Sequence, residues 1–286
     1  MKPETVCTVV FSPTGTSKKI AETVARSIAS DAGTEAAALK TIDLKTIDLT
    51  HAAAHSAALS AGAVAVIAAP VYGGHVAPTA AKRLETLRGS GTPAVVIAVY
   101  GNRAFEKAAA ELAALAARQG FVPVAAAAFV GEHSYSTPET PVAAGRPDAQ
   151  DLARAAEFGA AVRKKLAAGT PAPVDAAKLK DVHTPLVPML RFIRFVVGYR
   201  RRQKKNPVVY LPACDADRCT HCGRCAAICP TQAIARGDEA HTDPARCIRC
   251  CACVKGCPVG ARSFHTPFAA ALARSFTRRK QPVTIL

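Results

Sequence analysis

The sequence predicts a doubly wound α/β domain with a parallel sheet, followed by a second, small α+β domain. Three observations support this prediction. Strand-like and helix-like segments alternate through the first 170 residues. Ten of the 11 cysteines lie from Cys214 onward. The charge is also divided, because residues 1–170 hold 17 basic and 14 acidic side chains (net +3) and residues 171–286 hold 20 and 7 (net +13).

Five segments are expected to form strands, and all but the second are short runs of β-branched and apolar residues with the pattern of buried parallel strands. They are Thr5–Phe11, Glu35–Leu39, Ala63–Ala69, Ala94–Tyr100 and Val122–Val130. The second of these is the least distinct, because it adjoins two successive copies of KTIDL (residues 40–49) to which the pattern assigns no element. Two copies of five residues do not make a repeat protein.

Four helices are expected between and after these strands. They are Lys18–Ala29, Ala77–Leu87, Phe105–Gln119 and Asp148–Ala168. Thr16 or Ser17 can cap the first helix, Pro78 is tolerated in the first turn of the second, and Gly120 ends the third. Alternation of this kind predicts a parallel sheet with helices on both faces.

Three loops follow strands, at the sheet edge where such folds bind ligands. The first, Ser12–Ser17, offers hydroxyls and helix N-terminal N–H groups to a phosphate, although it lacks the Lys-Ser/Thr pair of a Walker loop. The loops Pro70–His75 and Tyr100–Arg103 each combine an aromatic ring with glycine, as a planar ligand requires. Singly, each loop reads as an ordinary turn, but their shared place after successive strands favours a ligand site.

The cysteines carry the most specific motif of the chain. The frame C-x2-C-x2-C-x3-C-P occurs twice, and this is the bacterial run for [4Fe–4S] clusters. Because the fourth cysteine of each run ligates the other cluster, the expected sets cross over. They are Cys219, Cys222, Cys225 and Cys257 for one cluster, and Cys247, Cys250, Cys253 and Cys229 for the other. Zinc is the rival ligand, but zinc frames pair two C-x2-C hairpins across a longer gap.

Composition restricts the remaining function classes. Half of the residues are apolar, which excludes disorder as the main state. The formal net charge of +16 brings nucleic acid, an anionic membrane or an acidic partner into consideration. The chain opens Met-Lys-Pro-Glu without a leader pattern, and no apolar stretch reaches the roughly 18 uncharged residues of a membrane span. We therefore expect a cytoplasmic protein without a transmembrane segment.

The two domains are expected at residues 1–170 and 211–266, with a linker at 171–210 and a basic C-terminal tail at 267–286. The linker is Pro-rich and then basic, and it contains MLRFIRFVVGYRRRQKK at Met189–Lys205. This segment fits a helix that packs between the domains with a solvated basic end. The alternatives are docking of an acidic partner, peripheral contact with an anionic membrane, or nucleic-acid binding.

The first domain resembles the flavodoxins. SPTGTS is similar to their flavin-phosphate loop, and PVYGGHV and VYGNR are similar to the loops that flank the flavin ring. The resemblance implies strand order 2-1-3-4-5 and bound FMN. The residues implied are Ser12, Thr14, Gly15, Thr16 and Ser17 at the phosphate, Tyr72, Gly73 and Gly74 on one side of the ring, and Tyr100, Gly101 and Asn102 on the other. Unlike many flavodoxins the chain has no tryptophan, so Tyr72 or Tyr100 would stack on the flavin.

The whole chain resembles the flavodoxin–ferredoxin fusion proteins of anaerobic prokaryotes, including the stretch Phe129–Ser134 after the last strand, which we expect near the flavin or the domain junction. The resemblance implies an iron–sulfur flavoprotein that relays electrons between two [4Fe–4S] clusters, FMN and an acidic redox partner protein. A flavin-dependent reductase fed by the clusters is the alternative, and a redox or nucleic-acid-binding sensor is the third. DNA binding is not expected.

The cofactors would also change the charge of the protein. Each oxidised cluster with four thiolates adds about −2 and the FMN phosphate about −2, so the assembled protein would be nearer +10 than +16. The remaining excess lies largely in Arg191–Lys205 and the tail, where it predicts a basic docking surface.

Overall fold

The fold was analysed in a computed structural model, which describes residues 3–30, 42–51 and 56–286. Five parallel strands form the centre of a sheet in the order β2-β1-β4-β7-β8, which confirms the predicted order 2-1-3-4-5. Their bounds are β1 Thr5–Val10, β2 Asp43–Asp48, β4 Ala63–Tyr72, β7 Thr92–Tyr100 and β8 Phe121–Val130. The short strand β5 (His75–Val76) folds back onto β4 as an antiparallel neighbour.

Helices cover both faces of this sheet, as the alternating pattern predicts. On one face, α1 (Thr16–Ala29) and α4 (Ala149–Ala167) pack on one set of strand side chains. On the other, α2 (Pro78–Leu84), α3 (Ala108–Arg118) and the 3-10 turn η1 (Ala176–Lys178) pack on the alternate set. Since successive strand side chains point to opposite faces, the central strands are buried on both sides.

The edge strand and the second helix of the first domain have other bounds than the predicted segments. The predicted second strand, Glu35–Leu39, lies outside the described residues, and the strand that pairs with β1 is β2, inside the KTIDL segment. The predicted helix Ala77–Leu87 ends earlier, at Leu84. The next residues form β6 (Leu87–Gly89), which pairs in parallel with β3 (Ala57–Leu59) beside the main sheet.

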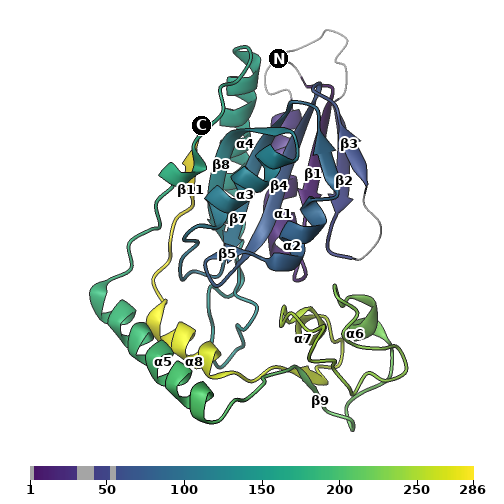
Figure 1. Cartoon of the computed structure of the whole chain (residues 1–286), viewed down its shortest axis with the longest axis vertical. Helices are drawn as coiled ribbons and strands as arrows, with labels where there is room; N and C mark the ends of the chain where they lie inside the picture. The colour runs from purple at the N-terminus through teal and green to yellow at the C-terminus, as the bar shows by residue number, and fades with distance from the viewer. Residues whose placement is uncertain (1–2, 31–41, 52–55) are drawn as a thin grey trace.

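The segment after the first domain is helical for 20 residues. α5 (Leu186–Lys205) lies against α8 (Pro267–Ser275), and Figure 1 shows the two side by side beneath the sheet. Aromatic rings hold the pair together, with ring centroids 5.0 Å apart both for Phe192 and Phe276 and for Phe195 and Phe268. The segment is helical as expected, but Phe192 is its only buried residue, so its apolar half is covered on the aromatic side alone.

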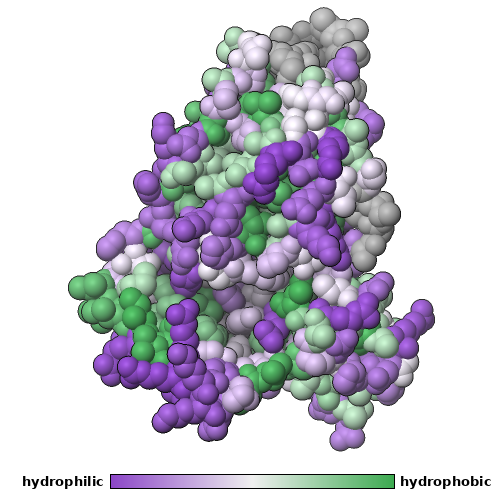
Figure 2. All heavy atoms as spheres, in the orientation of Figure 1, coloured by the Kyte–Doolittle hydropathy of each residue, from purple (hydrophilic) through white to green (hydrophobic). Residues whose placement is uncertain are grey.

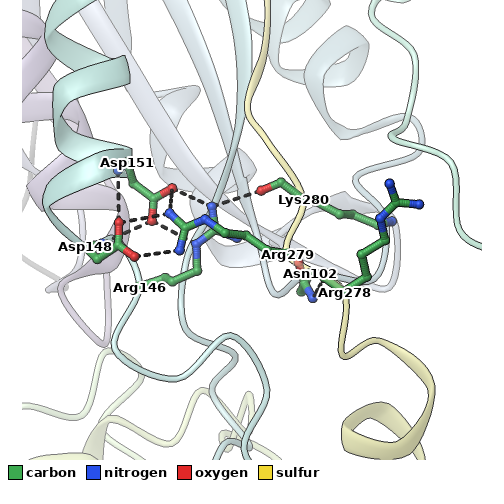
Figure 3. A network of polar contacts seen from close by, with 7 residues as sticks. All are labelled: Asn102, Arg146, Asp148, Asp151, Arg278, Arg279 and Lys280. Atoms are coloured by element: carbon green, nitrogen blue, oxygen red, sulfur yellow. Dashed lines mark hydrogen bonds and ion pairs between the residues drawn. The ribbon is translucent and has the colours of Figure 1, made fainter.

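The C-terminal segment (residues 276–286) returns to the first domain. Its strand β11 (Val283–Ile285) extends the main sheet as an antiparallel neighbour of β8. Before β11, Arg279 donates to Asp148 at 2.6 Å and to the buried Asp151 at 3.2 Å (Figure 3). Lys280 donates to the carbonyl of Arg103 at 2.5 Å. Two basic residues of the expected basic tail, Arg279 and Lys280, therefore bind partners in the first domain.

The cysteine-rich unit lies beside α5 and α8 and below the carboxyl edge of the sheet (Figure 1). Its small antiparallel sheet pairs β9 (Ala213–Cys214) with β10 (Arg262–Ser263). Two one-turn helices, α6 (Arg224–Ala227) and α7 (Ala252–Lys255), each follow a residue in the left-handed conformation. Tight turns of this kind let each cysteine run wrap around a compact centre.

Candidate functional site

A cavity of about 410 Å³ lies between the carboxyl edge of the sheet and the second half of the chain. This volume is within the range of small-molecule and cofactor sites, and the carboxyl edge is where doubly wound sheets bind ligands. All three predicted loops contribute to its wall. Eight of the eleven predicted flavin-site residues line the cavity, namely Ser12, Thr14, Thr16, Ser17, Tyr72, Gly73, Tyr100 and Gly101.

The first loop is shaped to hold an anion. Gly15 adopts φ 82° as the N-cap residue of α1, whose N-terminus faces the loop. The Ser12 hydroxyl accepts a hydrogen bond of 3.1 Å from the Lys18 backbone N–H. The Ser17 hydroxyl is 1% exposed and has no hydrogen-bond partner, although its residue lines the cavity. A buried hydroxyl without a partner at a helix N-terminus fits a phosphate group.

Three predicted residues lie outside the cavity wall. Gly15 shapes the loop, and Gly74 (φ 93°) meets the side chain of Glu106, which leaves no space for a Cβ. Asn102 is 3% exposed and donates to the carbonyls of Phe276 and Arg278 at 2.7 and 3.0 Å. Asn102 therefore holds the C-terminal segment in place rather than facing the cavity.

The two tyrosines expected beside a planar ligand differ in environment. Tyr100 is 2% exposed, and its ring packs edge-on against Phe105 with centroids 5.5 Å apart, within the core. Tyr72 is only partly buried by neighbouring protein atoms and belongs to the cavity wall. Tyr72 is thus the predicted ring that remains available for stacking.

The second part of the stretch Phe129–Ser134, which was expected near the flavin or the domain junction, lies at the cavity. Gly131, Glu132, His133, Ser134 and Tyr135 all line the wall. The Nδ1 atom of His133 accepts a hydrogen bond of 3.0 Å from the Tyr135 backbone N–H, so the neutral ring carries its proton on Nε2. Burial lowers the pKa of His133 to about 4, and the nearby positive charges of Lys255 and Arg103 act in the same direction. The ring is therefore neutral at pH 7.

The opposite wall of the cavity comes from residues that sequence reasoning did not assign to a site. They belong to α5, the segment after it, the second cysteine run and α8, and include Phe192, Tyr199, Tyr210, Ile248, Arg249, Cys250, Phe264 and Phe268. The aromatic spacing of Met189–Lys205 was the available signal, because Phe192, Phe195 and Tyr199 recur on one helix face. A flat ligand would lie between this aromatic wall and the strand-end loops.

The eight predicted cysteine ligands form two groups of four, each around its own small cavity. Cys219, Cys222, Cys225 and Cys257 line one, which we call the distal set. Cys229, Cys247, Cys250 and Cys253 line the other, the proximal set. Each group takes its fourth cysteine from the other run, which is the crossed arrangement that the motif predicts. The two runs approach closely at Gly256, where an added Cβ would meet the end of the Ile228 side chain.

The surroundings of these cysteines fit anionic clusters. Backbone N–H groups of Ala233 and Ala261 donate to the sulfurs of Cys229 and Cys257, each at 3.2 Å. Arg262 is 4% exposed, and its Nε atom is buried without a partner. Burial raises the pKa of Cys253 to about 11, so the thiolate requires a bound metal to form at neutral pH.

The remaining cysteine of the second run, Cys251, also lines the proximal cavity. It occupies the left-handed position before α7, with φ 59°, and is 2% exposed. Within the described ranges, no three His, Cys, Asp or Glu side chains converge closely enough to chelate a single ion. None of the described helices is long and apolar enough to cross a membrane.

Comparison with known proteins supports the assignment of the second domain. Residues 211–265 match the family model of the 4Fe-4S dicluster domain. No curated protein matches the chain.

Solved structures similar to the chain align with its first part. A flavodoxin from the domain Archaea is 14% identical over 57% of this chain and 99% of its own, with a TM-score of 0.34. A flavodoxin from Streptococcus pneumoniae TIGR4 is 18% identical over 57% and 97%, with a TM-score of 0.35. The rubredoxin oxygen:oxidoreductase of Desulfovibrio gigas is 13% identical over 58%, with a TM-score of 0.37, and only 37% of its length is matched. The strand order β2-β1-β4-β7-β8, and not these similarities, establishes the fold.

Proposed function

We propose that this flavodoxin–ferredoxin fusion is an electron-transfer iron–sulfur flavoprotein, which relays electrons between two [4Fe–4S] clusters, a bound FMN and a redox partner protein. When bound, the clusters exchange single electrons and the flavin accepts one or two. The observation that carries the proposal is the position of Cys250. It belongs to the proximal cysteine set and also lines the large cavity, so the two sites share a wall.

The chain's own residues support FMN as the occupant of that cavity. Ser12, Thr14, Thr16 and Ser17 would hold the phosphate with hydroxyl groups and with the positive end of α1. The aromatic wall from α5 and α8 would exclude water from the ring, which keeps the reacting edge away from solvent. Neutral His133 offers one N–H donor, and it adds no positive charge at pH 7.

The two cysteine sets would have different roles. The proximal set is more buried, with Cys250 and Cys253 at 8% and 7% exposure. In the distal set Cys222 is exposed, and the exposed Arg218, Arg224 and Arg236 lie around it. Electrons would therefore be exchanged with the partner at the distal set and with the flavin at the proximal set. A basic rim of this kind favours an acidic partner.

Cofactor analysis after anaerobic purification tests this proposal. We expect about eight irons per chain, with matching sulfide, and FMN released by acid in about equal amount to protein. Zinc in place of iron would contradict the clusters, and a protein that binds no flavin would contradict the cavity assignment. Turnover of a small acceptor without any partner would instead favour a flavin-dependent reductase.

A further inference from the structure

α5 presents an apolar stripe to solvent. Leu186, Leu190, Ile193 and Val197 follow one another at intervals of four, three and four residues, which places them on one helix face. Their exposed fractions are 69, 49, 47 and 43%, and the adjacent Val187 is 66% exposed. Large aliphatic side chains are rarely exposed in a continuous row without a function.

This orientation is determined by packing on the other side of the helix. Phe192 is 8% exposed, and its ring lies 5.0 Å from that of Phe276. The ring centroids of Tyr199 and Phe268 are 4.9 Å apart, and both residues line the large cavity. The apolar stripe therefore points outward because the aromatic face of α5 is already occupied.

The charge of α5 is entirely positive. The helix holds seven basic residues and no acidic residue. Five of them lie in its last two turns, and all five are exposed, namely Arg200, Arg201, Arg202, Lys204 and Lys205. Figure 2 shows the result on the surface, where a hydrophobic area over the first part of α5 adjoins a hydrophilic area over its last turns.

We propose that α5 binds the surface of an anionic membrane, lying parallel to it. The aliphatic stripe would enter the boundary between headgroups and acyl chains, and the basic turns would contact lipid phosphates. An exposed aliphatic row beside a purely basic segment has the composition of an interfacial helix. The proposal does not depend on the identity of the cofactors.

Two other occupants fit the same surface less well. A redox partner would need to reach a cluster, whereas no residue of α5 lines the cavity of the distal or the proximal cysteine set. Transient redox complexes also use small and polar interfaces. A second copy of the chain would bring seven further positive charges to the same face, and like charges oppose that association.

Sedimentation of the intact protein with lipid vesicles tests the proposal. We expect the protein to bind vesicles of phosphatidylcholine mixed with phosphatidylglycerol. Its affinity for vesicles of phosphatidylcholine alone should be weaker by about tenfold or more. The double variant Arg200→Gln/Arg201→Gln should bind the anionic vesicles about 30-fold more weakly, at roughly a factor of five for each base removed. Leu190→Ser/Ile193→Ser should also release the protein, and more completely at high salt.

The matched control is Arg118→Gln/Lys164→Gln, which removes the same charge from exposed sites on α3 and α4. It should bind as the parent does, and all variants should keep the parental iron and flavin content. Absence of vesicle binding would overturn the proposal, as would an equal loss in the control. A dimer in solution that Leu190→Ser/Ile193→Ser dissociates, or saturable capture of an acidic protein by α5 without vesicle binding, would also overturn it.

Discussion

Lys255 of α7 donates a hydrogen bond of 2.5 Å to the Glu132 carboxylate in the loop after β8. The pair joins the cysteine-rich unit to the first domain, and Glu132 also lines the cavity. Lys255 donates as well to the Ser136 carbonyl at 3.1 Å. Burial alone would raise the pKa of Glu132, but Lys255 and the Gly145 N–H outweigh it and hold this pKa below its usual value. Glu132 therefore stays ionised and paired at neutral pH.

A double-mutant cycle on Lys255→Met and Glu132→Gln should give a coupling free energy of about 1 kcal/mol, because the pair is charged but partly solvated. Anaerobic chemical denaturation of the cofactor-loaded protein measures it. The matched control is the exposed pair Lys18–Asp48, whose charged atoms are 3.5 Å apart and whose coupling should be near zero. Equal coupling in the two cycles would mean that Lys255 and Glu132 do not join the domains.

Single cysteine variants should separate the two sets. Cys250→Ser should lower the iron content from about eight to about four by loss of the proximal cluster, and Cys222→Ser should do the same at the distal set. Cys251→Ser is the control, because this thiol adjoins the proximal set without belonging to the motif. Iron analysis checks all three, and a comparable loss in Cys251→Ser would require a different ligand set.

Ser17→Ala should weaken FMN binding by about tenfold or more, because the buried hydroxyl would lose a hydrogen bond to a charged phosphate. Thr23→Ala serves as the control on the same helix, since its hydroxyl donates only to the Lys19 carbonyl at 2.8 Å. Flavin titration of the deflavinated protein measures both affinities. Unchanged affinity in Ser17→Ala would place the phosphate elsewhere.

His133 should make the protein less stable in acid. Its pKa is about 4 in the native state and near 6.5 when unfolded, so only the unfolded state binds a proton as the pH falls between these values. Stability is therefore fully present above pH ~6.5 and is lost progressively toward pH ~4, by about 2 kcal/mol at pH ~5. His133→Gln should remove this part of the pH dependence, while the exposed His241→Gln should not. Denaturation at pH 7 and pH 5 measures the free energy of unfolding of each protein. An equal loss of this free energy between pH 7 and pH 5 in the parent and in His133→Gln would contradict the prediction.

Neighbouring arginines of the C-terminal segment offer a further comparison. Arg279 pairs with Asp148 and the buried Asp151, whereas the Arg278 side chain points away from the network (Figure 3). Arg279→Met should destabilise the protein by about 1–3 kcal/mol, because a charge on Asp151 loses a partner, and it should lower Tm by several degrees. Arg278→Met should have little effect. Thermal unfolding under anaerobic conditions compares them, and equal losses would show that the network does not hold the segment.

The parallel core was predictable because its strands are continuously apolar and its helices are amphipathic. The edge was not, because β2 is largely exposed and lacks the buried pattern that marks the central strands. β11 has only three residues, and its pairing with β8 joins residues more than 150 positions apart, so no local pattern could indicate it.

The site was predictable to a similar degree. The spacing of the cysteines predicted which of them line each small cavity, since the motif itself determines which thiols can meet. The three strand-end loops were also predictable, because each of them follows a strand that the sequence pattern indicates. The aromatic wall from Phe192, Tyr199 and Phe268 was not, because it depends on how α5 and α8 pack against the sheet. The internal partners of Arg279 and Lys280 likewise follow from tertiary contacts that net charge does not reveal.

The most direct test of the relay is the rate at which flavin is reduced after the clusters receive electrons in an anaerobic rapid-mixing experiment. If one chain holds the whole relay, this rate should not change with protein concentration, and Cys250→Ser should abolish the fast phase. A rate proportional to protein concentration, or a fast phase that survives in Cys250→Ser, would contradict electron transfer through the shared wall of the two sites.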